Sequence, residues 1–193
     1  MGDLDVVRGA LKGQYHAALA MLRQAVVKCP EELWASGGYG GQTGQPNPFW
    51  RVAYHTLYFV HLYLMQTVKD FRAWEHHQTR IQDLDEWPAP PEIEDLCELP
   101  HRPVQTGVAY TKAQLLEYWD VCDGMVDARV DAMDLYTRES GFPWYTKFGS
   151  KLEHQMLSIR HIQGHMAQLG ERLKGAGVGG IDWVGTAKER GKS

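Results

Sequence analysis

Apolar residues recur at steps of three and four along several stretches of this chain, and that spacing constrains its fold more than any other feature. The first stretch runs from Leu4 to Lys28, with apolar positions at Leu4, Val7, Leu11, Tyr15, Leu19, Leu22 and Val26. One face of an α-helix repeats at this interval, whereas a half-buried strand alternates every two residues. Pro30 ends the stretch, because proline lacks the N–H group that a helix interior requires. The spacing therefore predicts an amphipathic helix over residues 4–28.

A second helix is predicted from Asn47 and Pro48, which resemble an N-cap followed by proline at the first helical position, to about Lys69. Its segment Val52–Val68 contains no Asp, Glu, Lys or Arg. The segment is nevertheless too short and too polar to span a membrane, because its 17 residues include His55, Thr56, His61 and Gln66. A helix that is apolar nearly all round belongs in the interior of a helical protein.

Two further helices follow from the same periodicity. Thr111 predicts the N-cap of a third helix that extends to about Tyr136, with an inner face of Leu115, Tyr118, Cys122, Met125, Val126, Val130 and Met133. A fourth helix is closed by Gly175 and Gly177, and its apolar residues have heptad-like spacing: Leu152, Met156, Ile159, Ile162, Met166, Leu169 and Leu173. No stretch has a convincing strand pattern.

The connections between these helices complete the predicted fold. Residues 37–48 read as a loop, and the stretch from Phe71 to Tyr110 contains Pro88, Pro90, Pro91, Pro100 and Pro103. Such a stretch predicts a long connection, with a short helix near residues 72–82. Beyond Gly180 we expect Trp183 to fold back onto the helices before a frayed, charged end. We therefore predict a single all-α domain over residues 1–193, an antiparallel four-helix bundle with a long connection between helices two and three.

Charge and cysteine content exclude several classes of protein. The net charge is −4 and the basic residues are dispersed, so we expect no nucleic-acid partner. Cys29, Cys97 and Cys122 are odd in number and far apart, which indicates a reducing compartment rather than a disulfide framework. No signal-peptide pattern opens the chain. These features predict a cytoplasmic protein.

Histidines mark the candidate site. His161 and His165 are four residues apart, which places them one turn apart on one helix face, and His55 on the second helix can meet them across a bundle core. The three are candidate metal ligands, although a histidine on an apolar face can also be a hydrogen-bonded core residue. His61 lies on a different face from His55, so one of that pair is structural. His154 is expected outside the ligand set, as an outer residue or on the surface.

A weaker alternative cluster is predicted in the long connection, formed by His76, His77 and His101. These residues fit a solvated loop better than a metal site. The predicted ligand set therefore remains His55, His161 and His165.

The segment Pro48-Phe49-Trp50-Arg51-Val52-Ala53-Tyr54-His55-Thr56, together with His161-x-x-x-His165-Met166-Ala167-Gln168-Leu169, resembles the DinB-like (YfiT-like) metal-binding superfamily. The resemblance covers nearly all four helices. It implies a three-histidine site with one ligand on the second helix and two on the fourth, followed by a glutamine. His55, His161 and His165 occupy those positions, and Gln168 is the implied orienting residue. The aromatic start of the second helix is also similar to the N-terminal bundle of ergothioneine-forming sulfoxide synthases.

The resemblance implies a metal-dependent thiol S-transferase or a related enzyme with a small-molecule substrate and a low-molecular-weight thiol as co-substrate. All-nitrogen ligation suits Zn, Ni or Fe better than Mg or Ca. A metal-dependent hydrolase assisted by Glu153 or Glu171 is one alternative, and a non-enzymatic metal-binding stress-response bundle is another. Possible substrate-contacting or core aromatic residues are Trp50, Tyr54, Tyr58, Trp144 and Tyr145. Association as a homodimer is also open.

Overall fold

The computed structural model describes residues 2–36, 47–78, 81, 82, 84 and 108–186. Every helix or strand assigned within these residues is a helix, which confirms the all-α prediction. The helices are α1 (Asp3–Lys28), α2 (Glu31–Trp34), α3 (Phe49–Tyr63), the 3₁₀ helix η1 (Val68–Asp70), α5 (Lys112–Ala132) and α6 (Lys151–Gly175). Residues 37–46 of the predicted loop 37–48 and most of the long connection lie outside the described residues.

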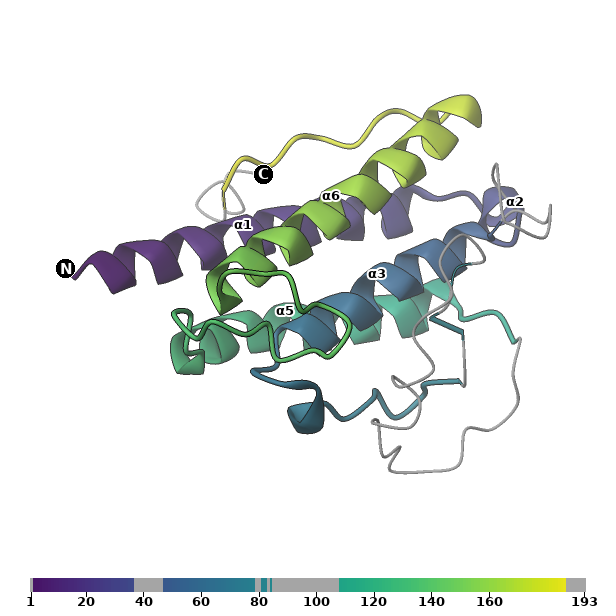
Figure 1. Cartoon of the computed structure of the whole chain (residues 1–193). Helices are drawn as coiled ribbons and strands as arrows, with labels where there is room; N and C mark the ends of the chain where they lie inside the picture. Colours follow the sequence, from purple (N-terminus) through teal and green to yellow (C-terminus); the bar gives the residue numbers. More distant parts are fainter. Residues whose placement is uncertain (1, 37–46, 79–80, 83, 85–107, 187–193) are drawn as a thin grey trace.

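The four long helices lie side by side, with α1 and α6 above α3 and α5 in the view of Figure 1. Helix α1 packs against α5 and α6, and α3 packs against the same two helices. The second half of α6 matches the predicted periodicity, because Ile162, Met166, Leu169 and Leu173 are buried in the core. The prediction was wrong for Met156, which is 57% exposed, because polar residues are buried in the first half of α6: Lys151, His154, Gln155 and Ser158. Helix α3 is buried on every side, with Arg51 as its one partly exposed residue. This near-complete burial explains why its sequence is apolar all round.

The prediction that the second helix reaches Lys69 was wrong, because α3 ends at Tyr63. Contacts from distant residues hold the chain beyond this point. The buried Lys151 Nζ donates to the carbonyl oxygens of Met65 at 2.7 Å and Gln66 at 2.9 Å. Gly141 approaches the same turn with φ +84°, and a Cβ atom there would lie 2.1 Å from the Gln66 carbonyl oxygen. Only glycine fits this approach.

Two other predicted helix boundaries also shift. Helix α3 begins at Phe49 with Pro48 as its N-cap, one residue later than predicted. The N-cap of α5 is Thr111, as predicted, since its hydroxyl accepts from the Gln114 N–H at 3.2 Å. Helix α5 nevertheless ends at Ala132 rather than near Tyr136. The Asp134 N–H donates to the side chain of Gln66 instead of continuing the helix.

The short helix predicted near residues 72–82 is absent from the part of that segment that the structure describes. Residues 71–78, 81 and 82 form turns and extended chain instead. Tertiary packing decides this conformation, because Trp74 stacks on Tyr118 with ring centroids 4.6 Å apart. The His77 imidazole is hydrogen bonded to the Tyr54 hydroxyl.

The segment after α6 returns along the long helices (Figure 1). Gly177 has φ +74° and turns the chain, after which Gln24 on α1 exchanges two hydrogen bonds with the backbone of Asp182. Ile181 and Val184 are partly buried against the core, but Trp183 is 75% exposed. The prediction that Trp183 packs on the helices was therefore wrong, since neighbouring aliphatic residues take that place. The charged end at residues 187–193 lies outside the described residues.

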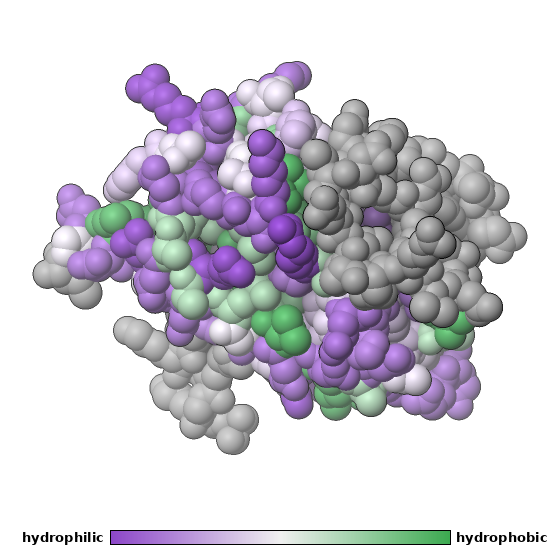
Figure 2. Space-filling view, turned by 90° about the horizontal axis from the view of Figure 1, so that it is seen from below, coloured by the Kyte–Doolittle hydropathy of each residue, from purple (hydrophilic) through white to green (hydrophobic). Residues whose placement is uncertain are grey.

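Hydrophilic residues dominate much of the face seen in Figure 2, and strongly hydrophobic residues form small separate patches there. None of the described helices is long and apolar enough to cross a membrane.

His16 on α1 links that helix to α5 and makes folding stability depend on pH. Its Nδ1 lies 2.7 Å from Asp123 Oδ1, and this hydrogen bond is the main cause that raises the pKa of His16. The folded chain therefore holds the proton more tightly than the unfolded chain, whose histidine pKa is about 6.5. The stabilisation is complete below that value and is lost as the pH rises through the raised folded pKa.

We expect His16→Asn to lower the free energy of unfolding more at about pH 6 than at about pH 9. Urea unfolding of both proteins at the two pH values measures this difference. An equal loss at both values would show that the charge of His16 is irrelevant to stability.

Candidate metal centre

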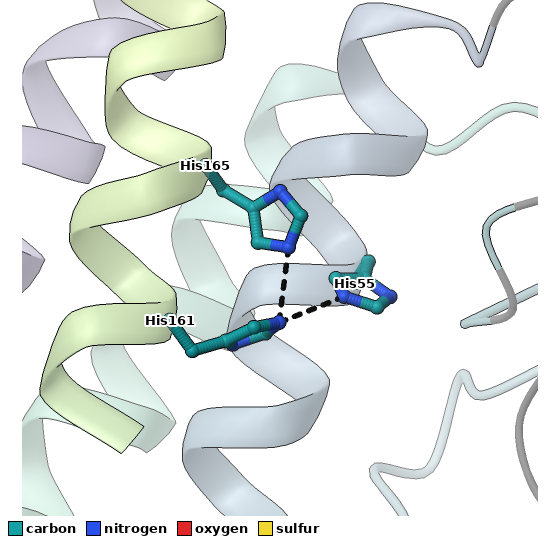
Figure 3. Close-up of side chains that lie close together, drawn as sticks. All are labelled: His55, His161 and His165. Atoms are coloured by element: carbon teal, nitrogen blue, oxygen red, sulfur yellow. Dashed lines mark hydrogen bonds between the residues drawn. The ribbon is translucent and has the colours of Figure 1, made fainter. Parts of the chain in front are cut away.

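Three imidazole rings meet between α3 and α6 (Figure 3). His161 Nε2 lies 3.0 Å from His55 Nε2 and 2.9 Å from His165 Nε2. The ligand atoms of all three rings lie within 4.8 Å of one another. The structure thus brings together the three histidines predicted as ligands.

The helical framework explains this meeting. His161 and His165 occupy successive turns of α6, and α3 packs directly against that helix. Phe59, one turn after His55 on α3, places its ring 4.7 Å from the His55 ring and 5.5 Å from that of His161. The phenyl ring therefore forms an apolar wall beside the imidazoles.

The outer nitrogens of two rings are held by oxygen acceptors. His55 Nδ1–H donates to the carbonyl oxygen of Gln82 at 2.6 Å, and His165 Nδ1–H donates to Gln168 Oε1 at 2.8 Å. A neutral imidazole carries one proton, so both Nε2 atoms present lone pairs to the centre of the cluster. His161 Nε2 faces both of them and can donate a proton to only one. At least one Nε2 lone pair in the cluster is therefore left without a hydrogen-bond donor from the other two rings.

Burial keeps the His55 and His161 rings neutral. It lowers the pKa of His55 well below its usual range and that of His161 to about 3. Charge repulsion between the imidazoles acts in the same direction. Neutral imidazole is the form that binds a metal ion, so the protonation state of these two residues suits ligands.

The donor set fits a divalent transition metal. Zinc–nitrogen distances of about 2.0–2.1 Å place two ligands of a tetrahedral ion about 3.3 Å apart. The observed separations of 2.9 and 3.0 Å differ from this value by a few tenths of an ångström. Three protein ligands leave a coordination position for water or substrate, as in catalytic zinc sites.

Other buried histidines serve different contacts. His61 Nδ1 lies 3.2 Å from the Tyr118 hydroxyl, so His61 is the structural member of the pair it forms with His55. Burial lowers the pKa of His61 to about 4. His154 is fully buried rather than on the surface, enclosed by the rings of Tyr63, Phe142, Tyr145 and Phe148.

The weaker cluster predicted in the long connection does not form among the described residues. His77 is buried against Tyr54, whereas His76 is exposed beside Glu75 and Glu117. His101 lies outside the described residues. The exposed group of Glu75, His76 and Glu117 could also hold an ion, and sequence reasoning missed it because Glu117 comes from α5.

The two predicted assisting carboxylates are not in the histidine cluster. Glu153 accepts from the Gly149 N–H at 2.7 Å, and Glu171 accepts from Lys174 at 2.9 Å. Both side chains are exposed. Among the described residues, the histidine group contains no carboxylate ligand.

The predicted aromatic contacts divide into two sets. Trp50, Tyr54 and Tyr58 are buried in the core, and Tyr54 stacks on Tyr110 with centroids 4.7 Å apart. Tyr145 instead lines a cavity of about 510 Å³ beside η1, while Trp144 is partly buried against the core. Phe59 contacts the cluster instead, and its i+4 spacing from His55 was the signal for this contact.

Comparison with protein families, curated proteins and solved structures finds no match to this chain.

Proposed function

We propose that this chain is a DinB-like antiparallel four-helix bundle that binds one Zn, Ni or Fe ion through His55, His161 and His165. We propose further that it is a metal-dependent thiol S-transferase with a small-molecule electrophile as substrate. The observation that carries the metal site is that the Nε2 atoms of the three histidines converge. In His55 and His165, the Nδ1–H donates to an oxygen acceptor, so Nε2 keeps a lone pair that can bind a metal ion. The packing of α1 and α3 against both α5 and α6 supports the bundle.

The absence of a carboxylate from the described histidine group favours a thiol over water as the nucleophile. A cysteine-like thiol has a pKa of about 8–9, whereas water has a pKa of about 15.7, so a thiol needs less help to ionise. A bound divalent ion would lower the pKa of the thiol further and hold the sulfur beside the electrophile.

The chain's own residues would orient and enclose the reacting groups. The Gln82 carbonyl and the Gln168 side chain fix two imidazole rings, and Phe59 limits water on one side of the cluster. The thiol proton passes to solvent, the sulfur forms a bond to the electrophilic carbon, and the leaving group departs with its bonding electron pair. The product is a thioether.

Metal removal tests this function. We expect chelated protein to lose consumption of cysteine in the presence of a chlorodinitrobenzene electrophile. Reloading with about one equivalent of Zn, Ni or Fe should restore it, since three ligands define one ion site. The same preparations are assayed for hydrolysis of a nitrophenyl ester.

Three outcomes are distinct. Metal-dependent thiol consumption supports the transferase, whereas metal-dependent ester hydrolysis alone would replace it with the hydrolase. Loss of thermal stability on chelation without either activity would indicate a non-enzymatic metal-binding bundle.

A further inference from the structure

His161 differs from His55 and His165 at Nδ1, the ring nitrogen that points away from the centre of the cluster. His161 Nδ1 is buried and has no hydrogen-bond partner among the described residues, whereas the Nδ1 atoms of His55 and His165 each have an oxygen acceptor. Metal-bound histidines nearly always donate the outer N–H to an acceptor, which fixes the tautomer and the ring orientation. An acceptor for His161 is therefore expected close to that ring.

Ser158 is positioned to supply this acceptor. It precedes His161 by three residues on α6, and helical side chains lean toward the preceding turn. Ser158 is 1% exposed. Its hydroxyl can donate toward the Tyr15 oxygen, and no described residue donates to the Ser158 oxygen. A buried nitrogen that can donate and a buried oxygen that can accept thus belong to residues three apart on α6.

Neighbouring polar groups already have other roles. The Gln155 carboxamide accepts from the Tyr15 hydroxyl at 2.7 Å and donates to the Tyr63 carbonyl oxygen at 2.9 Å. His154 lies seven residues before His161, about 10 Å along the helix axis. Among these side chains of α6, Ser158 is the one whose oxygen can still accept from His161.

We propose that Ser158 is a positioning residue of the metal centre that accepts the Nδ1–H of His161, either directly or through one buried water. This role rests on the proposed metal site. Fixing the proton on Nδ1 leaves a lone pair on His161 Nε2, which would complete the set of three inward-facing donors. Without that acceptor, the central ligand is free to place its proton on Nε2, the atom that would bind the ion.

Zinc titration of metal-free protein tests the role of Ser158. We expect Ser158→Ala to weaken zinc affinity about 10–100-fold, the effect typical of losing an outer partner of a ligand. Ser158→Thr keeps the hydroxyl and should recover most of that loss. His154→Phe removes another buried polar atom from α6 without affecting His161, so its affinity should equal that of the wild type.

NMR of the histidine ring protons gives a second readout. In the zinc-loaded wild type, His161 Nδ1–H should be protected from solvent exchange, and this protection should disappear in Ser158→Ala. Unchanged affinity and unchanged protection in Ser158→Ala would overturn the role of Ser158 while leaving the metal site intact. An equal loss in His154→Phe would also overturn it. If wild type and His161→Ala bind zinc equally, the metal site fails, and the role of Ser158 fails with it.

Discussion

Zinc is expected to raise the melting temperature of the wild-type protein by about 5–10 °C and to leave that of His161→Ala unchanged. A ligand at about 100 times its Kd stabilises the folded state by about 2.7 kcal/mol, and each kcal/mol shifts the melting temperature of a domain this size by about 2–4 °C. His161 is the central residue of the cluster, because its Nε2 lies 3.0 and 2.9 Å from the Nε2 atoms of His55 and His165. Its removal leaves two ligands, fewer than zinc sites use.

Elemental analysis accompanies the thermal measurement. We expect about one ion per wild-type chain and almost none in His161→Ala, consistent with one three-ligand site. The control is His76→Ala, which removes the exposed histidine beside Glu75 and Glu117. Loss of the ion in this control, with the ion retained in His161→Ala, would place metal binding in the exposed group and contradict the buried site.

The helices were predictable because their signal is local. Residues three and four apart face the same core whatever the rest of the chain does, so the bounds of α1 and α6 differ little from expectation. The ends of α3 and α5 depend instead on distant groups. Lys151 donates hydrogen bonds to two carbonyl oxygens just after α3, and the Gln66 side chain accepts a hydrogen bond from the Asp134 N–H just after α5. No pattern within either helix carries that information.

In the candidate site, too, local contacts could be predicted from sequence spacing and contacts between distant residues could not. The spacing of His161 and His165 predicts their meeting from helix geometry alone. The addition of His55, 106 residues away from His161, depended on the bundle prediction and on the resemblance to the DinB-like superfamily. The contact of His55 with Gln82 could not be predicted, because any residue can offer a backbone carbonyl. The role of Ser158 could not be predicted either, because it follows from the buried His161 Nδ1, which has no hydrogen-bond partner among the described residues.

Lys151→Met is expected to lower the free energy of unfolding by about 3 kcal/mol, because the variant leaves buried carbonyl oxygens without a donor. Lys151 is fully buried, and its Nζ donates to the carbonyl oxygens of Met65, Gln66 and Ser140 at 2.7–2.9 Å. These contacts join the end of α3, the segment before α6 and α6 itself. Urea unfolding measures the loss, and the exposed Lys147→Met is the matched control.

The loss should also depend on pH, in a direction set by burial. Burial lowers the pKa of Lys151 to about 7, while the lysine of the unfolded chain keeps a pKa of about 10.4. Between these values the unfolded state binds more protons, so wild-type stability rises with pH relative to Lys151→Met. A difference that stays constant from about pH 6 to 10 would contradict the lowered pKa. A variant as stable as the wild type throughout would show that the three carbonyls find other donors, and that Lys151 does not hold the end of α3.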